Sequence, residues 1–183
     1  MPTVSFDQLP DNARVWVFAS DRRLQGHEAK VLLDAVDGFL NQWKAHGAAL
    51  RSARDWRDDR FLAIGVDPTA EQASGCSIDG LFRSLQQLER TLATGLVAGG
   101  RVFYRDETGE PRLALRQEMP ALFSRGVITA DSRVFDTSVT DARSWRERFE
   151  RPARETWVAS LVPAHANQSA SRSATNSSSV KKG

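Results

Sequence analysis

The segment 67–79, DPTAEQASGCSID, gathers a thiol, hydroxyls and carboxylates that could do chemistry. Cys76 is the only cysteine of the chain, so no intrachain disulfide can form. A thiol that lies in the first turn of a helix and faces a cation can act as a nucleophile or a redox-sensitive group, with His27 as a candidate base. The alternative, which we favour, is that Cys76 is a small buried apolar residue, because free cysteine is among the most buried residue types.

The same loop and the segment 20–23 also carry groups that bind anions. Arginine side chains and the free amides at a helix start can hold a phosphate or a carboxylate. Alternatively, both arginines are solvated or paired with Asp21 and Glu28, Ser74 or Ser77 is a helix cap, and Asp79 offsets the helix dipole. The candidate ligand-binding residues are Ser20, Arg22, Arg23, Asp67, Ser74, Gly75, Ser77 and Asp79, and the candidate catalytic residues are Cys76 and His27.

Hydrophobic periodicity predicts the elements that must position these groups. Apolar runs bounded by turn residues predict strands, and apolar residues three and four positions apart predict helices. In chain order the predicted elements are strand 14–19, helix 26–46, strand 49–56, strand 61–66, helix 77–96, strand 101–105 and strand 112–115. This order, βαββαβ with one added strand, predicts an α+β fold with a ferredoxin-like core.

In a ferredoxin-like sheet the first and third strands are parallel neighbours at the centre. The loops that leave their C-terminal ends then lie side by side, where binding sites tend to collect. We therefore expect the segment 20–23 to face the loop 67–77, with His27 on the same edge. His46 is excluded as a base, because a helix of about 20 residues places its far end roughly 30 Å away.

Both faces of these two strands are apolar, so two helices on one face leave the other face uncovered. The C-terminal elements could cover it, or a partner subunit, which would make the chain a structural homodimer. The expected C-terminal elements are a helix at 117–123, a strand at 133–135 and a helix at 141–149 capped by Thr140. Residues 5–160 are expected to form a single domain, and the Ser- and Ala-rich stretch 161–183 a disordered tail.

Several kinds of enzyme have no support in the sequence. The chain has no GxxxxGK[ST] loop, so Walker-type ATP hydrolysis is not expected, and it lacks the GxSxG elbow of serine hydrolases. One cysteine and the scattered His27, His46 and His165 have no zinc-ligand spacing. Neither a metal nor another cofactor is therefore expected.

The basic pI of about 9.0 belongs to the C-terminal end of the chain. Of 25 basic and 23 acidic residues, the segment 162–183 holds three basic ones and no acidic one, so residues 1–161 carry a net charge of −1. This charge gives no argument for a nucleic-acid partner. No apolar run approaches the roughly 20 residues that span a bilayer, and no signal peptide is recognisable, so a cytoplasmic protein without membrane association is expected.

Five segments form a recognisable pattern: VWVFASDR (15–22), FLNQWKAHGAAL (39–50), FLAIGVD (61–67), ASGCSID (73–79) and FERPARETW (149–157). They resemble a family of small bacterial proteins often labelled ABC transporter ATPases. The resemblance covers about residues 5–157, and ASGCSID and the W-x-x-H-G segment are its most specific parts. It assigns no catalytic residue, and the label conflicts with the missing P-loop. The residues that match the family pattern in the loop are Asp67, Ser74, Gly75, Cys76, Ser77 and Asp79.

Together these observations predict a cytoplasmic module, without ATPase activity, that binds a small anionic ligand or a protein partner at an edge shared by Arg22 and Cys76. One alternative is an enzyme or redox switch that depends on Cys76. The other is a structural homodimer, which follows from the two apolar faces of the central strands.

Overall fold

The computed structural model describes residues 4–69, 72–97 and 99–162, and the chain divides into two compact units. Unit 1 consists of Met1–Gly99 and Asp136–Phe149, and unit 2 of Gly100–Phe135 and Glu150–Gly183. The stretch 5–160, expected as one domain, is thus divided between the two. Most of the expected tail, from residue 163 onward, lies outside the described residues.

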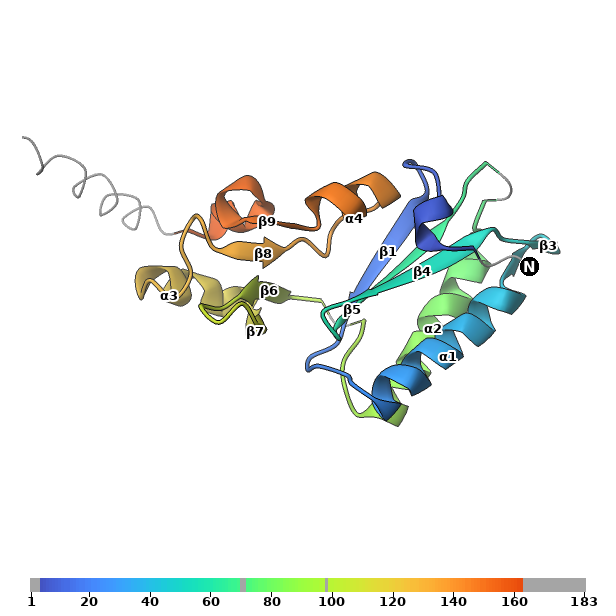
Figure 1. Ribbon diagram of the computed structural model, residues 1–183, viewed down its shortest axis with the longest axis horizontal. Helices are drawn as coiled ribbons and strands as arrows, with labels where there is room; N and C mark the ends of the chain where they lie inside the picture. Colours follow the sequence, from blue (N-terminus) through green and yellow to red (C-terminus); the bar gives the residue numbers. More distant parts are fainter. Residues whose placement is uncertain (1–3, 70–71, 98, 163–183) are drawn as a thin grey trace, which may run out of the picture. The chain divides into compact units, whose positions relative to one another are not determined.

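Unit 1 is built on a three-stranded sheet in which β5 lies between β1 and β4 (Figure 1). The strands are β1 (Arg14–Ala19), β4 (Ser52–Arg57) and β5 (Phe61–Val66). Their β-branched and aromatic side chains favour a pleated, packed surface, and the central β5 is buried along its whole length. The predicted strands 14–19 and 61–66 are confirmed, whereas the strand expected at 49–56 begins three residues later.

The strands of this sheet are all antiparallel. Arg14 pairs with Val66 and Ala19 with Phe61, so β1 and β5 run in opposite directions. The expected parallel pairing of these two strands is therefore wrong, while the α+β class holds. The physical reason is that an apolar run reports burial of a strand and not its direction. Here a tight turn at Asp58 and Asp59 connects β4 to β5, which pairs with β4 along one edge. Strand β1 pairs with the other edge of β5.

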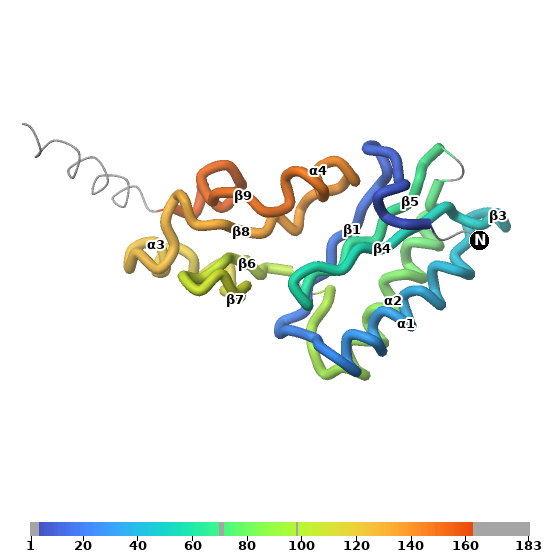
Figure 2. The backbone as a smooth tube through the Cα atoms, in the orientation of Figure 1, coloured from blue at the N-terminus to red at the C-terminus, as the bar shows by residue number. Residues whose placement is uncertain are grey.

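Two helices cover one face of the sheet, α1 (His27–Gln42) and α2 (Gly75–Leu92), and they run side by side (Figure 2). Leucines of both helices form a core with Phe18, Leu62 and Ile64 of the strands. Helix α1 ends earlier than the predicted residue 46, because the chain enters a short hairpin of β2 (Lys44–Ala45) and β3 (Ala48–Ala49).

The other face of the sheet is covered by η1 (Phe6–Gln8) and α4 (Ala142–Arg148). The Phe6 and Trp145 ring centroids lie 6.4 Å apart, and those of Phe61 and Phe149 lie 5.1 Å apart. The prediction that a C-terminal helix covers this face is confirmed. Its cap is Asp141 and not Thr140, since the Asp141 carboxylate accepts a hydrogen bond from the Ser144 amide at 2.8 Å.

Gly65 lies directly beneath this cover. A Cβ atom on Gly65 of β5 would lie 2.5 Å from Cδ1 of Leu9 and 3.2 Å from Cε2 of Phe6. The N-terminal segment therefore packs directly on the backbone of the central strand. Because unit 1 covers both faces of its own sheet, the apolar strands give no reason to invoke a partner subunit.

Unit 2 contains a separate four-stranded antiparallel sheet with the order β7-β6-β8-β9. Its strands are β6 (Arg101–Arg105), β7 (Pro111–Leu115), β8 (Arg133–Phe135) and β9 (Glu150–Pro152). The hairpin at 101–115, expected to extend the first sheet, belongs to this one, and the strand at 133–135 is confirmed.

The helical segments of unit 2 are short. The helix expected at 117–123 forms as a 3-10 turn followed by one α-helix, and two further 3-10 turns follow β9. These segments are η2 (Arg116–Glu118), α3 (Met119–Ser124), η3 (Ala153–Glu155) and η4 (Trp157–Leu161). Met119, Phe123, Ala153 and Val158 from them join Val102 and Val134 in a small core. In the part of the chain that the structure describes, no helix is long and apolar enough to cross a membrane.

Candidate functional site

The structure separates the two halves of the predicted site. Because β1 and β5 are antiparallel, the segment 20–23 follows the end of β1 beside the start of β5, whereas the loop 67–77 follows the far end of β5. Helix α2 runs back along the sheet, so that Arg22 Nη2 donates to the Leu92 carbonyl at the end of α2, 2.9 Å away. The expected site shared by Arg22 and Cys76 is therefore wrong.

At the first of these ends the predicted ligand-binding residues are occupied by protein partners. Arg22 makes a two-pronged ion pair with Glu28, with distances of 2.6 and 2.7 Å, and its hydrogen bonds hold the pKa of Glu28 below the usual range. Arg23 pairs with Asp59 at 2.8 Å. The buried Ser20 hydroxyl donates to the Arg22 carbonyl oxygen. These groups hold the turn that follows β1.

Cys76 lies in the first turn of α2 and is exposed, so the expected burial of this residue is wrong. His27 starts α1 at the opposite end of the sheet and cannot serve as its base. The far end of α1 is the one that reaches the start of α2, where Trp43 Nε1 donates to the Ser77 carbonyl at 2.9 Å. The histidine at the same end as Cys76 is therefore His46, between β2 and β3. The antiparallel sheet therefore reverses the expected choice between His27 and His46 as the histidine at the Cys76 end.

The remaining polar residues at the start of α2 organise the helix itself. The Ser74 hydroxyl accepts a hydrogen bond from the Ser77 amide at 3.3 Å, and the Ser77 hydroxyl donates to the Ser74 carbonyl at 2.8 Å. Ser74 is thus the helix cap, as the alternative interpretation held. Gly75 and Asp79 are exposed, on the first two turns.

Asp67, directly after β5, anchors the loop that leads to α2. Its side chain is only 2% exposed and accepts hydrogen bonds from the Thr69 hydroxyl at 2.6 Å and from Arg51 at 2.6 Å. These bonds, chiefly the one from Thr69, hold the pKa of Asp67 below its usual range. The carboxylate therefore has its partners within the protein.

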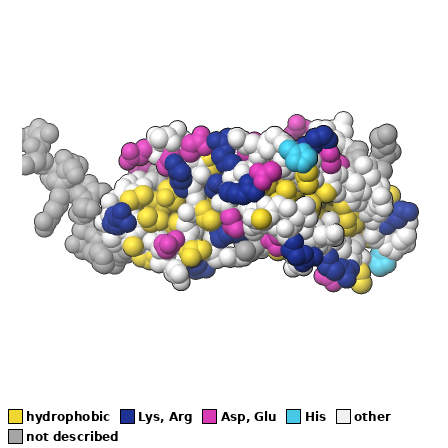
Figure 3. All heavy atoms as spheres, turned by 90° about the horizontal axis from the view of Figure 1, so that it is seen from below, with side chains coloured by type: hydrophobic (Ala, Val, Ile, Leu, Met, Phe, Trp, Pro, Cys, Tyr) yellow, Lys and Arg dark blue, Asp and Glu magenta, His cyan; other side chains and the backbone are white. Residues whose placement is uncertain are grey.

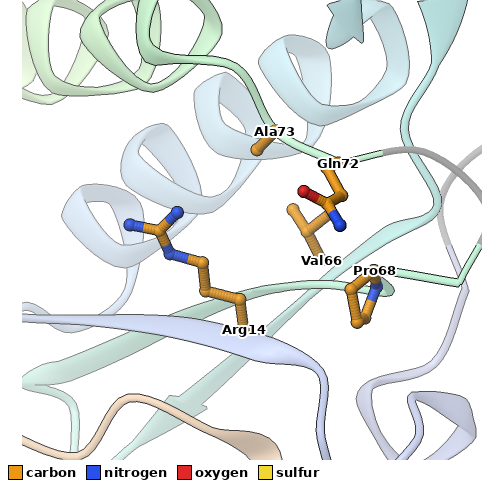
Figure 4. A pocket seen from close by; sticks show the side chains of 5 residues that line it. All are labelled: Arg14, Val66, Pro68, Gln72 and Ala73. Carbon is orange, nitrogen blue, oxygen red and sulfur yellow. The ribbon is translucent and has the colours of Figure 1, made fainter.

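A cavity of about 230 Å³ opens beside this anchored loop (Figure 4). It is lined by Arg14, Val66, Pro68, Gln72 and Ala73. Figure 4 shows the Arg14 guanidinium on one side and the Gln72 amide and Pro68 ring on the other, with Val66 between them. Antiparallel pairing places Arg14 directly beside Val66, and so it brings the first residue of β1 to the loop that follows β5.

Arg14 differs from the other arginines near the predicted site in what it contacts. Its guanidinium carbon lies 4.6 Å from the centroid of the Trp16 ring, and no carboxylate of the described residues lies within ion-pair distance of it. A guanidinium that rests on an aromatic face keeps its N–H groups at its edge for a planar anion. Among the lining residues that the structure describes none is acidic, and Arg14 brings a positive charge to the cavity.

A buried hydroxyl lies next to the cavity wall. Ser52, Val66 and Arg14 form one row across β4, β5 and β1, and directly opposed residues of a sheet point to the same face. Ser52 is fully buried, and within the described residues its hydroxyl has no hydrogen-bond partner. A buried hydroxyl without a partner is unfavourable, so a ligand or water molecule that forms a hydrogen bond with it stabilises the protein.

Sequence reasoning missed Arg14, Gln72 and the cavity itself. A charged residue at the start of an otherwise apolar strand was the available signal, but it acquires meaning only once β1 and β5 are known to be antiparallel. Among the described residues no group of three or more His, Cys, Asp or Glu side chains could hold a metal ion. On the face in view in Figure 3, basic and acidic side chains are interspersed.

Comparison of the chain with protein families, with curated proteins and with solved structures finds no match. The resemblance to the bacterial family therefore stays a prediction, and the site is interpreted from its own geometry.

Proposed function

We propose that this chain is a binding module for a small monocarboxylate, held in the cavity beside Arg14. The observation that carries the proposal is a guanidinium that lines a cavity and has no carboxylate partner among the described residues. The proposal keeps the expected anionic ligand and moves it from Arg22 to the opposite end of the sheet. It supports no catalytic step and no ATPase activity.

The chemistry of the lining selects the ligand. The planar fork of an arginine matches the two oxygens of a carboxylate, and a single positive charge balances a monoanion. Val66, Pro68 and Ala73 offer apolar contact to a short hydrocarbon chain, and the Gln72 amide can donate or accept a hydrogen bond. The volume of about 230 Å³ is below the roughly 300 Å³ at which drug-sized pockets begin. A ligand of a few carbon atoms fits these limits.

We favour this function over the two alternatives on specific grounds. A Cys76 nucleophile would lack both the base and the cation that the sequence suggested for it, since His27 and Arg22 lie at the other end of the sheet. A homodimer formed to cover the sheet is unnecessary, because η1 and α4 cover that face within unit 1.

The test measures binding of straight-chain carboxylates from acetate to hexanoate by calorimetry at low salt. Arg14→Ala is expected to weaken binding by about tenfold or more, because a hydrogen bond to a charged group contributes roughly 1.5–3 kcal/mol. Arg14→Lys keeps the charge and loses the fork, so it should bind with intermediate affinity.

The matched control is Arg83→Ala, which removes an exposed arginine from α2 and should leave binding unchanged. The proposal fails if the native protein binds none of these carboxylates at millimolar concentration. It also fails if Arg14→Ala binds them as well as the native protein does.

A further inference from the structure

A second feature of unit 1, the outer edge of β1, is independent of the Arg14 cavity. Alternate residues of β1 turn their backbone groups away from β5. The Val15 amide donates to the Thr140 carbonyl at 2.8 Å, and the Ala19 amide donates to the Leu96 carbonyl at 3.2 Å. Val17 lies between Val15 and Ala19, and its backbone N–H and C=O point to the same side, away from β5. Within the described residues its N–H and C=O on this edge have no partner.

A cavity of about 220 Å³ lies along this open stretch of the edge. It is bounded by residues 15–18 of β1, by Phe82 and Val97, and by the segment 137–140. The Phe82 ring packs edge-on against Phe18, with 5.4 Å between the ring centroids. Among the described residues that line it none is charged, and Thr137, Ser138 and Thr140 supply hydroxyl groups. This cavity shares no lining residue with the one beside Arg14.

The exposed backbone groups form a short row with a defined order. The Val15 carbonyl accepts, the Val17 amide donates and the Val17 carbonyl accepts, and all three face the same side of the strand. A typical hydrogen bond contributes a net of about 0.5–1.5 kcal/mol, so a ligand that pairs with these open groups gains affinity. A complementary ligand carries a donor directly beside an acceptor on one edge.

The two ends of the opening limit the size of that ligand. Thr140 and Leu96 already pair with β1 on either side of Val17, at residues only about 13 Å apart at 3.3 Å per residue. A continuous strand from a partner protein would have to displace both segments. A single ring system needs no such displacement.

We propose that this edge cavity binds a neutral planar heterocycle of the nucleobase type, paired to the backbone of Val15 and Val17 and packed beside Phe82. The ring edge of adenine presents an amino donor next to a ring nitrogen acceptor, and that pattern matches the row on β1. The absence of charge in the lining favours a free base or nucleoside over a phosphorylated one.

The direct test is an NMR titration of the native protein with adenine. The Val17 amide should shift on binding, together with the signals of residues 15–18. N6,N6-dimethyladenine lacks the donor and should bind about tenfold more weakly, as expected for one lost hydrogen bond. Adenosine monophosphate should bind no more tightly than adenosine.

A pair of variants isolates the backbone donor. Val17→Pro removes the N–H, and since that group faces away from β5 no bond within the sheet is lost. Adenine affinity should fall about tenfold, whereas Val17→Ala keeps the N–H and should stay within threefold of the native value. Adenine that leaves the Val17 amide unshifted, or that binds Val17→Pro and native protein alike, overturns the proposal. If Val17→Pro does not fold, the titration of the native protein decides alone. Hexanoate should not compete, which separates this result from that at Arg14.

Discussion

At the scale of single residues, the neighbours of an arginine decide its role more than its charge does. Arg22 pairs with Glu28, Arg23 with Asp59 and Arg51 with Asp67, and each pair fastens a turn or a loop. Arg14 rests on an aromatic ring instead and lines a cavity. Sequence reasoning named Arg22 and Arg23 as ligand-binding residues because they follow the strand 14–19. Its alternative interpretation already named Glu28 as a partner, whereas Asp59, 36 positions from Arg23, is not visible in a local pattern.

The buried Asp67 makes stability depend on pH in a defined direction. Its pKa is lowered in the folded state by Thr69 and Arg51, so its contribution is fully present above the unfolded value near 3.9 and is lost as the pH falls through the folded value. We expect Asp67→Asn to reduce the free energy of unfolding at pH 7 by about 1–3 kcal/mol.

The check is urea unfolding of native protein and Asp67→Asn at pH 7 and at pH 3. The difference between them should shrink at the lower pH, because below the unfolded pKa near 3.9 the unfolded state binds a proton that the folded carboxylate, with its lowered pKa, binds less readily. A difference of the same size at both values would show that the charge of Asp67 does not contribute. Asp79→Asn, an exposed carboxylate on α2, is the control and should change stability by less than about 0.5 kcal/mol.

At the scale of elements, local patterns located the strands and helices well but not their directions. The strands 14–19 and 61–66 coincide with β1 and β5, since runs of branched and aromatic residues are a local property. Their antiparallel pairing depends on how distant segments pack in the folded chain, which a local pattern does not encode. The reversal moved the candidate site from Arg22 to Arg14, and it places His46 instead of His27 at the same end of the sheet as Cys76.

Helix α4 holds the second face of the sheet through Trp145. This side chain is fully buried, its Nε1 donates to Asp55 at 2.8 Å, and the Arg57 guanidinium lies 4.4 Å from its ring centroid. We expect Trp145→Ala to lower the free energy of unfolding by about 3–5 kcal/mol, because it leaves a large cavity and removes the hydrogen bond that Trp145 Nε1 donates to Asp55.

Chemical denaturation followed by circular dichroism measures this effect. Trp157→Ala in unit 2 is the control, since that residue is 37% exposed whereas Trp145 is fully buried, and it should cost clearly less than Trp145→Ala. Equal losses for the two variants would mean that α4 does not hold the sheet face as described. Trp145→Phe, which keeps most of the ring and loses Nε1, should fall between native protein and Trp145→Ala.

At the scale of the whole molecule, charge is divided unevenly along the chain. Residues 1–161 carry a net charge of −1, and the three cations Arg172, Lys181 and Lys182 make the total +2. The basic pI of about 9.0 therefore reports on the segment 162–183 and not on residues 1–161. Any attraction to a polyanion should come from that segment.

Removal of residues 162–183 tests this assignment. Weak binding of the full chain to duplex DNA at low salt should disappear in the shortened chain. For the full chain, the logarithm of affinity should fall with the logarithm of salt with a slope no steeper than about −3, because at most three cations can release counterions. A shortened chain that binds as well as the full one would place a basic surface within residues 1–161. Binding can be followed by fluorescence anisotropy.

The sequence by itself determined the α+β class, the approximate positions of the strands and long helices and the uneven charge, because these follow from local periodicity and composition. The tertiary structure alone decided the direction of β1 against β5, the assignment of the 101–115 hairpin to a second sheet and the exposure of Cys76. Those features depend on which distant segments meet. The candidate site belongs to this second group, since Arg14 and Gln72 are 58 positions apart and only antiparallel pairing brings them to one cavity.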